Sequence, residues 1–191
     1  MTPKLPLPAD ADLPEEIRTA LAALPPLNVF RMVAALPESF RPFLELGGSL
    51  LAGAEIDPRT REIAILRVAH VTGAAYEWAQ HVQLGRAVGV SEAEIEALAG
   101  DAAAAALDPD GALACRAAEE ISRDVRLSDE ALELLIDRWG EKGAAELILC
   151  VSYYNMVSRF LESTRVPIED AELLGGDSPA QLADRGRSAS S

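Results

Sequence analysis

The residues best suited to proton chemistry are concentrated in one stretch of the chain, residues 59–90. Both histidines, His70 and His81, lie there. Glu77 and His81 are four positions apart, a spacing that places two side chains on the same face of a helix. A carboxylate beside an imidazole stabilises the protonated ring and raises its pKa, so such a pair can donate or accept a proton near neutral pH. If this chain is an enzyme, we expect its chemistry here.

Other polar residues of the same stretch extend this candidate site. Glu62 lies on the preceding predicted helix, close to where that helix would cross the helix of His81, and Tyr76 offers a hydroxyl donor. Trp78 projects to the opposite side and is expected to pack. His70 is interpreted as a packed or surface histidine. A structural role for Glu77 and His81 stays open, because such pairs also occur on exposed helices, where each contributes only a few tenths of a kcal/mol.

The spacing of metal-binding residue types does not indicate a metal site. A metal ion needs about three ligands in suitable geometry. The two histidines and the neighbouring glutamates supply the residue types, but no HExxH or comparable spacing occurs. Cys115 and Cys150 lie far apart, in no spacing typical of metal or redox sites. Two buried free thiols are the simplest interpretation, with a disulfide as the open alternative.

The elements that must position these residues are helices. Hydrophobic residues make up 49% of the 191 and aromatic residues only 5%, a composition that favours close-packed helices over strands. No stretch alternates with a period of two for long enough to indicate a sheet. We therefore predict one all-α domain of eight or nine helices. The predicted helical segments are 13–24, 27–36, 37–53, 59–71, 75–88, 91–100, 111–125, 129–140 and 142–164.

Several helix ends carry recognisable capping residues. Asp57 followed by Pro58 is typical of an N-cap and a first helical turn. Ser91, with Glu94 three residues later, predicts a capping box. Gly89 is expected to end the helix of His81 in the left-handed conformation. These signals indicate where the helix of Glu62 begins, where the helix of His81 ends and where the next helix begins.

Charge and composition also bound the domain organisation and the partners. The net charge is −14, which repels phosphate backbones and anionic lipid, so we expect no nucleic-acid or membrane partner. The longest uncharged apolar stretch, residues 147–158, is shorter than the roughly 20 residues of a membrane span. No secretory signal is visible, and we expect a cytoplasmic protein. Residues 1–12 are predicted as a Pro-rich extended arm, 13–174 as one helical domain, and 175–191 as a flexible tail.

The stretch from residue 61 to residue 98 resembles the carboxymuconolactone decarboxylase family, which includes the alkylhydroperoxidase D-like proteins. The likeness rests on Arg61-Glu62, Tyr76-Glu77-Trp78, His81 and the Gly-Val-Ser segment that follows, and it extends over about residues 25–170. It implies an all-helical domain of the alkylhydroperoxidase D-like type that assembles into dimers, trimers or hexamers.

One branch of that family reduces peroxides with a Cys-x-x-Cys pair, and this chain departs from it. The positions that match the two cysteines hold Ala74 and Glu77. Disulfide-based peroxide reduction needs a thiolate nucleophile and a resolving thiol. Neither Cys115 nor Cys150 matches the motif, so a peroxidase-like activity is the weaker alternative.

The decarboxylase branch keeps the residues found here. The resemblance implies loss of CO₂ from a small carboxylated unsaturated lactone, with no metal and no organic cofactor. His81 and Glu77 are then the expected proton-transfer pair, and Glu62 orients them or acts as a second acid. Arg67 is expected to pair with the substrate carboxylate, its alternative being a salt bridge to a neighbouring glutamate.

The last predicted helix and the segment 27–53 complete these expectations. Tyr153, Tyr154 and Asn155 are expected to line the pocket, with Tyr154 as a substrate-binding residue, and an apolar helix at a subunit interface would explain them equally well. The two segments carry more apolar surface than one small domain can hide, which predicts a homo-oligomer. A non-catalytic oligomeric helical protein, in which the Glu–His pair only stabilises a subunit contact, is the remaining alternative.

Overall fold

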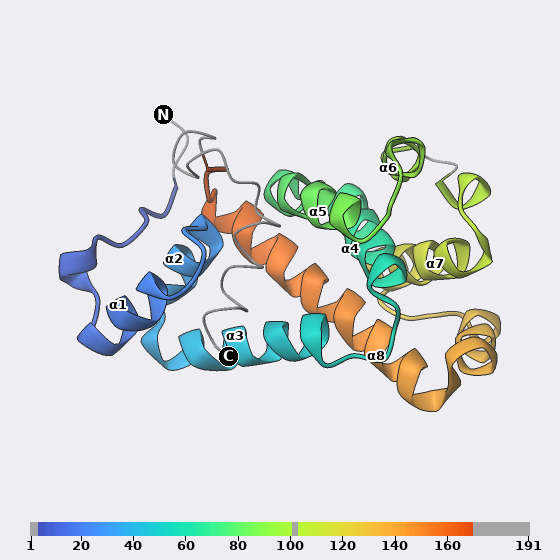
Figure 1. Ribbon diagram of the computed structural model, residues 1–191, viewed down its shortest axis with the longest axis horizontal. Coiled ribbons are helices and arrows are strands. Elements are labelled where there is room, and N and C mark those ends of the chain that lie inside the picture. The colour runs from blue at the N-terminus through green and yellow to red at the C-terminus, as the bar shows by residue number, and fades with distance from the viewer. Residues whose placement is uncertain (1–3, 101–102, 170–191) are drawn as a thin grey trace.

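The computed structural model describes residues 4–100 and 103–169, and this part of the chain is entirely helical (Figure 1). It holds eight α-helices, two short 3₁₀ helices and no strand. The all-α fold expected from the sequence is confirmed. The α-helices are α1 (Glu15–Ala22), α2 (Asn28–Ala34), α3 (Pro37–Ala52), α4 (Pro58–Thr72), α5 (Ala75–Ala87), α6 (Glu92–Leu98), α7 (Pro109–Asp124) and α8 (Asp129–Thr164).

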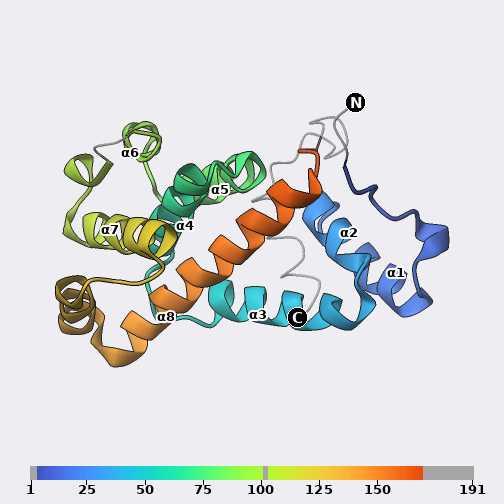
Figure 2. The same ribbon diagram turned by 180° about the vertical axis from the view of Figure 1, so that it is seen from behind.

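The long helix α8 divides the molecule. In Figure 1, α4, α5, α6 and α7 lie on one side of it and α1 and α2 on the other, while α3 crosses beneath; Figure 2 shows the same arrangement from behind. The central helix is α4, which packs against α5, α7 and α8. Every residue from 60 to 69 is buried. A helix buried on all sides must also bury its polar residues, and here these include Arg61, Glu62 and Arg67.

The caps that position α4 and α5 follow the sequence signals. The Asp57 carboxylate accepts a hydrogen bond from the Thr60 backbone N–H at 3.0 Å, and Pro58 occupies the first turn. Gly73, at φ 68°, ends α4 in the left-handed conformation. Glycine adopts this conformation without steric strain because it has no Cβ atom. Gly89 follows α5 with φ 94°. The predicted capping box at Ser91 is present at the start of α6.

Helix α8 combines two of the predicted helices. Its backbone departs from helical geometry at Gly140, with φ 70° and ψ 173°. The predicted segments 129–140 and 142–164 therefore meet at a kink. A residue with a Cβ would be strained at this positive φ. The second segment contributes Tyr153 and Tyr154 and most of the buried residues of α8.

The N-terminal segment differs from the sequence-based prediction. The N-terminal arm is not extended throughout, because Asp10–Asp12 forms a 3₁₀ turn. The Arg31 side chain holds this turn by donating to the Pro8 carbonyl at 3.0 Å and to Asp10 at 2.7 Å. Residues 103–106 form the second 3₁₀ helix. The segment 175–191, predicted as a flexible tail, lies outside the described residues.

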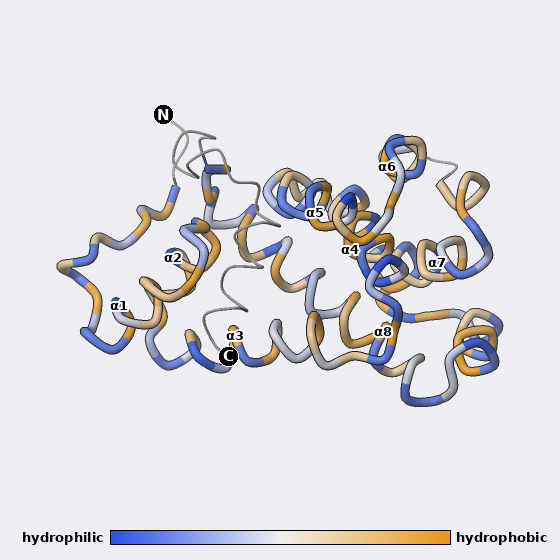
Figure 3. Tube along the Cα trace, in the orientation of Figure 1, coloured by the Kyte–Doolittle hydropathy of each residue, from blue (hydrophilic) through white to orange (hydrophobic). Residues whose placement is uncertain are grey.

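Apolar residues are distributed over all the helices. Figure 3 shows hydrophobic and hydrophilic residues interleaved along each of them. Over residues 4–100 and 103–169, no helix combines the length and the apolar character needed to cross a membrane.

Candidate active site

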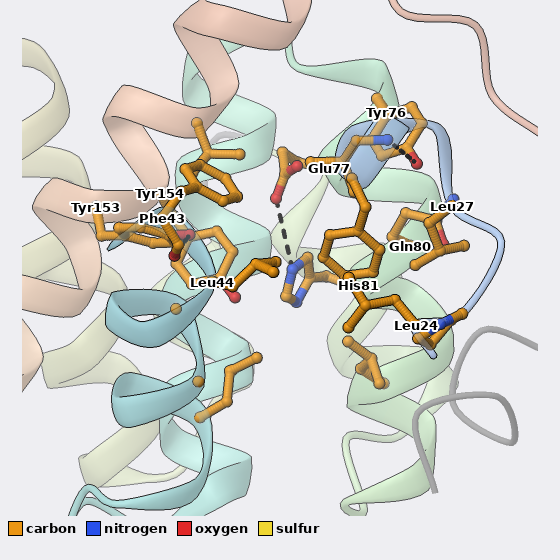
Figure 4. Close-up of a pocket in the computed structure, with 18 residues that line it drawn as sticks. Leu24, Leu27, Phe43, Leu44, Tyr76, Glu77, Gln80, His81, Tyr153 and Tyr154 are labelled. Atoms are coloured by element: carbon orange, nitrogen blue, oxygen red, sulfur yellow. Dashed lines mark hydrogen bonds and ion pairs between the residues drawn. The ribbon is translucent and has the colours of Figure 1, made fainter. Parts of the chain in front are cut away.

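A cavity of about 300 Å³ lies between α2, α3, α5 and α8 (Figure 4). Most of its wall is hydrocarbon, and the polar side chains come from α5 and α8. Its volume is at the lower end of those typical of small-molecule sites. The lining residues are Leu24, Pro25, Leu27, Val29, Phe30, Phe43, Leu44, Gly47, Gly48, Leu51, Tyr76, Glu77, Gln80, His81, Leu84, Tyr153, Tyr154 and Val157.

Three residues of the candidate site meet at this wall. His81 Nδ1 is 2.7 Å from a Glu62 carboxylate oxygen, and Nε2 is 3.5 Å from a Glu77 carboxylate oxygen. Glu77 and His81 lie on successive turns of α5, and Glu62 reaches them from α4. Glu77 and His81 line the cavity, whereas Glu62 lies behind them. The structure therefore brings together the three residues predicted as catalytic, and their catalytic roles stay predictions.

The two carboxylates control the charge of the imidazole. Burial of His81, which is 5% exposed, lowers its pKa. The charges and hydrogen bonds of Glu62 and Glu77 outweigh this effect and raise the pKa from 6.5 to about 10. His81 is thus an imidazolium at neutral pH. Its Nε2 faces Glu77, which also lines the cavity, and from there the ring can donate a hydrogen bond or a proton.

The raised pKa predicts how His81 titrates. We expect the His81 ring to stay protonated through neutral pH and to lose its proton only as the pH approaches about 10. The chain has two histidines, so a His70→Gln variant assigns their ¹⁵N ring signals in NMR spectra. In the Glu62→Gln variant the His81 pKa should fall, since the carboxylate that contributes most to the increase is gone.

The same shift has a consequence for stability. A group whose pKa is higher in the folded protein stabilises the fold below its unfolded pKa, near 6.5, and loses this contribution as the pH rises toward about 10. The free energy of unfolding of the wild type should therefore decline across that range more than that of His81→Gln. A ring that titrates near 6.5, or equal declines for the two proteins, would contradict the assigned geometry.

Two tyrosines of α8 close the wall beside His81. The Tyr154 ring packs edge-on against the His81 ring, with centroids 4.8 Å apart, and Tyr153 packs edge-on against Tyr154. The Tyr153 hydroxyl donates to the Phe43 carbonyl at 3.3 Å. A Cβ at Gly47 would lie 2.7 Å from that hydroxyl, so a larger residue there would displace the Tyr153 side chain. Burial raises the pKa of both tyrosines, which keeps their hydroxyls protonated.

Tyr76 lines the cavity, but its hydroxyl is engaged within the protein. It donates to a Glu169 carboxylate oxygen at 2.5 Å and accepts from the Val29 backbone N–H at 3.1 Å. Glu169 also accepts from Gln80 Nε2 at 2.6 Å and from the Asn28 backbone N–H. This network fastens the segment after α8 and the start of α2 to α5. The Tyr76 hydroxyl, expected to donate a hydrogen bond to a substrate, donates to Glu169 instead.

Sequence reasoning missed Gln80. This residue lies one position before His81, lines the cavity and is 7% exposed. Its Nε2 donates to Glu169, which fixes the orientation of the amide, since a carboxylate accepts only from the nitrogen. Its Oε1 is buried with no hydrogen-bond partner in the described part of the chain. No sequence signal indicated this, because it depends on a residue 89 positions away.

The structure places Arg67 away from the cavity, which corrects the prediction that it pairs with a substrate carboxylate. Its side chain is fully buried. Nε donates to Glu119 at 2.6 Å, and one terminal nitrogen donates to the carbonyls of Leu98 and Gly100 at 2.8 and 2.7 Å. The alternative, a salt bridge to a glutamate, is what the structure shows. Arg67 connects α4 to α7 and to the end of α6.

Two further candidates also lie outside the cavity wall. The Asn155 amide donates to Ser122 at 2.9 Å and to the Val151 carbonyl at 3.0 Å, which links α8 to α7. The His70 ring packs against Trp78, with centroids 6.3 Å apart. His70 is partly buried, and of the two interpretations, a packed or a surface histidine, the contact with Trp78 agrees with the packed one. Only Tyr153 and Tyr154 of the predicted trio line the cavity.

Both cysteines are free and buried, as the simplest interpretation predicted. Burial raises the pKa of Cys115 to about 11 and that of Cys150 to about 12. A thiol with so high a pKa carries almost no thiolate at neutral pH. Among the described residues there is also no group of three or more His, Cys, Asp or Glu side chains arranged to hold a metal ion.

Residues 37–120 match the family model of the carboxymuconolactone decarboxylase family. This segment spans α3 to α7 and includes Glu62, Glu77 and His81. No curated protein matches the chain.

Solved structures with the same fold carry descriptions related to peroxidases. A peroxidase-related protein with an alkylhydroperoxidase AhpD core, from Ralstonia eutropha, superposes with a TM-score of 0.77 at 17% identity, covering 91% of this chain and 97% of that one. A peroxidase-related protein from a Silicibacter species gives 0.76 at 18%, covering 93% of each chain. An Agrobacterium tumefaciens protein of unknown function, for which an antioxidant role has been suggested, gives 0.61 at 20%, covering 72% and 95%. At these identities the likeness shows the fold.

Proposed function

The chain belongs to the carboxymuconolactone decarboxylase family through residues 37–120, and on this premise we propose that it is an acid–base enzyme that works without thiols. The proposed chemistry is the formation and reprotonation of an enolate, as in lyases and isomerases. One observation carries the proposal. A Glu62–His81–Glu77 cluster stands at the wall of a cavity large enough for a small molecule.

Each member of the cluster has a distinct task. Glu77 lies at the wall and takes a proton from the carbon next to a substrate carbonyl. The C–H electron pair moves into the carbonyl group, and negative charge develops on its oxygen. The His81 Nε2–H donates a hydrogen bond to that oxygen, which lowers the barrier where water is excluded. Glu62 holds Nδ1 and so fixes the direction of the ring. Glu77 then returns the proton to carbon, and no other reactant is consumed.

The same residues would serve the decarboxylation expected from the sequence. Loss of CO₂ from a carboxylated lactone leaves the electron pair on a dienolate. His81 stabilises this dienolate, and the cluster then donates a proton to one of its carbon atoms. This reaction requires a carboxylate in the cavity. The described lining holds no Arg or Lys to receive it. The isomerase form, which moves a proton within a carbonyl compound, therefore fits the cavity better.

Deuterium incorporation tests the proposed function. β-Tetralone, a bicyclic ketone with acidic C–H bonds beside its carbonyl, is incubated with protein in D₂O and followed by NMR. The wild type should accelerate the exchange of hydrogen for deuterium at the carbons beside the carbonyl. Glu77→Gln removes the base and should reduce the acceleration by about 10²-fold or more. Glu133→Gln, an exposed residue of α8, is the matched control and should behave as the wild type. Equal rates with and without protein would reject the proposal.

The descriptions of the similar structures make a peroxidase the second candidate, and the thiols argue against it. Cys115 and Cys150 are buried, with raised pKa values. We expect no reduction of an alkyl hydroperoxide by the protein with dithiothreitol above the rate of the dithiol alone. Turnover that a thiol-alkylating reagent abolishes would contradict this expectation.

A purely structural role for the Glu–His pair is the third candidate. Such a pair would be sealed by protein on all sides. Instead, Glu77 and His81 line a cavity whose remaining wall is mostly hydrocarbon. This arrangement favours a ligand-binding role for the pair.

A further inference from the structure

The charges around the cavity indicate what kind of molecule it accepts. Among the described lining residues, only Glu77 and His81 carry a carboxyl or an imidazole group. The three tyrosines of the lining have raised pKa values, so their hydroxyls stay protonated. Two carboxylates, those of Glu62 and Glu77, flank the single imidazolium. The cluster therefore has no surplus positive charge. An anionic ligand would lose its hydration and face the Glu77 carboxylate, and the one cation of the described lining, His81, is already paired with two carboxylates.

The rest of the wall would bind hydrocarbon. Leu, Phe, Val and Pro side chains from α2, α3, α5 and α8 and from the residues before α2 surround the opening between the helices (Figure 4). Removing apolar surface from water contributes about 25 cal/mol per Å². A ligand with an extended apolar body gains most from such a wall.

One polar group of the wall has no partner. Gln80 Oε1 is buried and accepts no hydrogen bond within residues 4–100 and 103–169, while the nitrogen of the same amide is held by Glu169. Leaving a buried acceptor unpaired costs about 1–3 kcal/mol. A ligand hydroxyl or N–H donor at this point would remove that cost. Gln80 lies three positions after Glu77, on the same face of α5, so this donor would lie on the side of the ligand that faces Glu77.

We propose that the cavity binds a neutral, largely apolar carbonyl compound with a single hydrogen-bond donor, which pairs with Gln80 Oε1. The inference depends on the proposed function only for the carbonyl group beside Glu77 and His81. The neutral charge follows from the lining, and the donor follows from the unpaired amide oxygen. Gln80 is then a specificity-determining residue.

Three β-tetralones that differ in one ring substituent test the proposal. The substituents are methyl, hydroxymethyl and carboxylate, which are similar in size but represent an apolar group, a donor and an anion. Dissociation constants are measured by ligand-observed NMR or calorimetry, without turnover. We expect the hydroxymethyl compound to bind about tenfold more tightly than the methyl compound, the gain of one hydrogen bond, and the carboxylate to bind most weakly.

Variants of α5 assign the preference to a residue. Gln80→Leu removes the acceptor and should make the hydroxymethyl and methyl compounds bind equally. Gln83→Leu, on the same helix but outside the cavity lining, is the matched control and should preserve the wild-type order. If Gln80→Leu does not fold, the three constants of the wild type still decide the matter.

Each outcome bears on one proposal. Tightest binding of the carboxylate would overturn the neutral-ligand inference, and equal binding of the methyl and hydroxymethyl compounds to the wild type would overturn the role of Gln80. The expected order of affinities without C–H exchange would support this inference and count against the proposed function. C–H exchange together with the reversed order of affinities would support the proposed function and count against this inference.

Discussion

His81→Gln is expected to reduce the deuterium exchange of β-tetralone by about 10²–10⁴-fold, the contribution of a positioned acid or base. Glutamine is neutral, so it cannot replace the imidazolium that stabilises the enolate oxygen. Its amide can still donate to Glu62, which keeps a partner for that buried carboxylate. The domain should therefore fold, as circular dichroism and the elution volume would show.

His70→Gln is the matched control for this variant. His70 lies on α4 against Trp78, outside the cavity lining, and its replacement should leave exchange unchanged. Unchanged exchange in His81→Gln would remove His81 from the chemistry, and with it the proposed mechanism.

Arg67→Met is expected to lower the free energy of unfolding by about 3 kcal/mol, the lower end of the range for breaking a buried ion pair. Methionine preserves much of the apolar stem but removes the donors to Glu119, Leu98 and Gly100. Two carbonyls and a carboxylate lose their partner together. Urea unfolding at a fixed protein concentration measures the change, because any self-association would also affect stability.

The partner of Arg67 provides a graded comparison. Glu119 has a side chain that is 27% exposed, so water can solvate the groups left behind when it is changed. Glu119→Gln should therefore destabilise less than Arg67→Met. Because Arg67 lies outside the cavity, ligand affinities of the folded variant should match those of the wild type. A stability unchanged by Arg67→Met would contradict the role assigned to this residue.

The local part of the site could be predicted from the sequence. The spacing of Glu77 and His81 fixes their common face on α5. The break at Gly73 turns the chain so that α5 packs against α4, where Glu62 reaches the His81 ring. The caps at Asp57 and Ser91 are equally local. Each of these features depends on residues fewer than twenty positions apart, where helical geometry leaves few alternatives.

The part of the site that depends on distant residues could not be predicted from the sequence. Glu169 meets Tyr76 and Gln80 only because the segment after α8 returns to α5, and no periodicity encodes that contact. The role of Arg67 depended on whether a glutamate or a cavity would lie beside it. From the sequence, the apolar surplus of segment 27–53 predicts a subunit contact. The structure shows that part of this surplus lines the cavity, and self-association stays a prediction.

The central claim is that a carboxylate–imidazolium–carboxylate cluster moves the proton and that sulfur takes no part. The most direct test is the exchange rate of β-tetralone with a variant that has neither cysteine, Cys115→Ala with Cys150→Ala, compared with the wild type. The account predicts that the wild type accelerates exchange and that the variant retains this rate. Exchange that falls to the solution rate in the folded variant would contradict the claim.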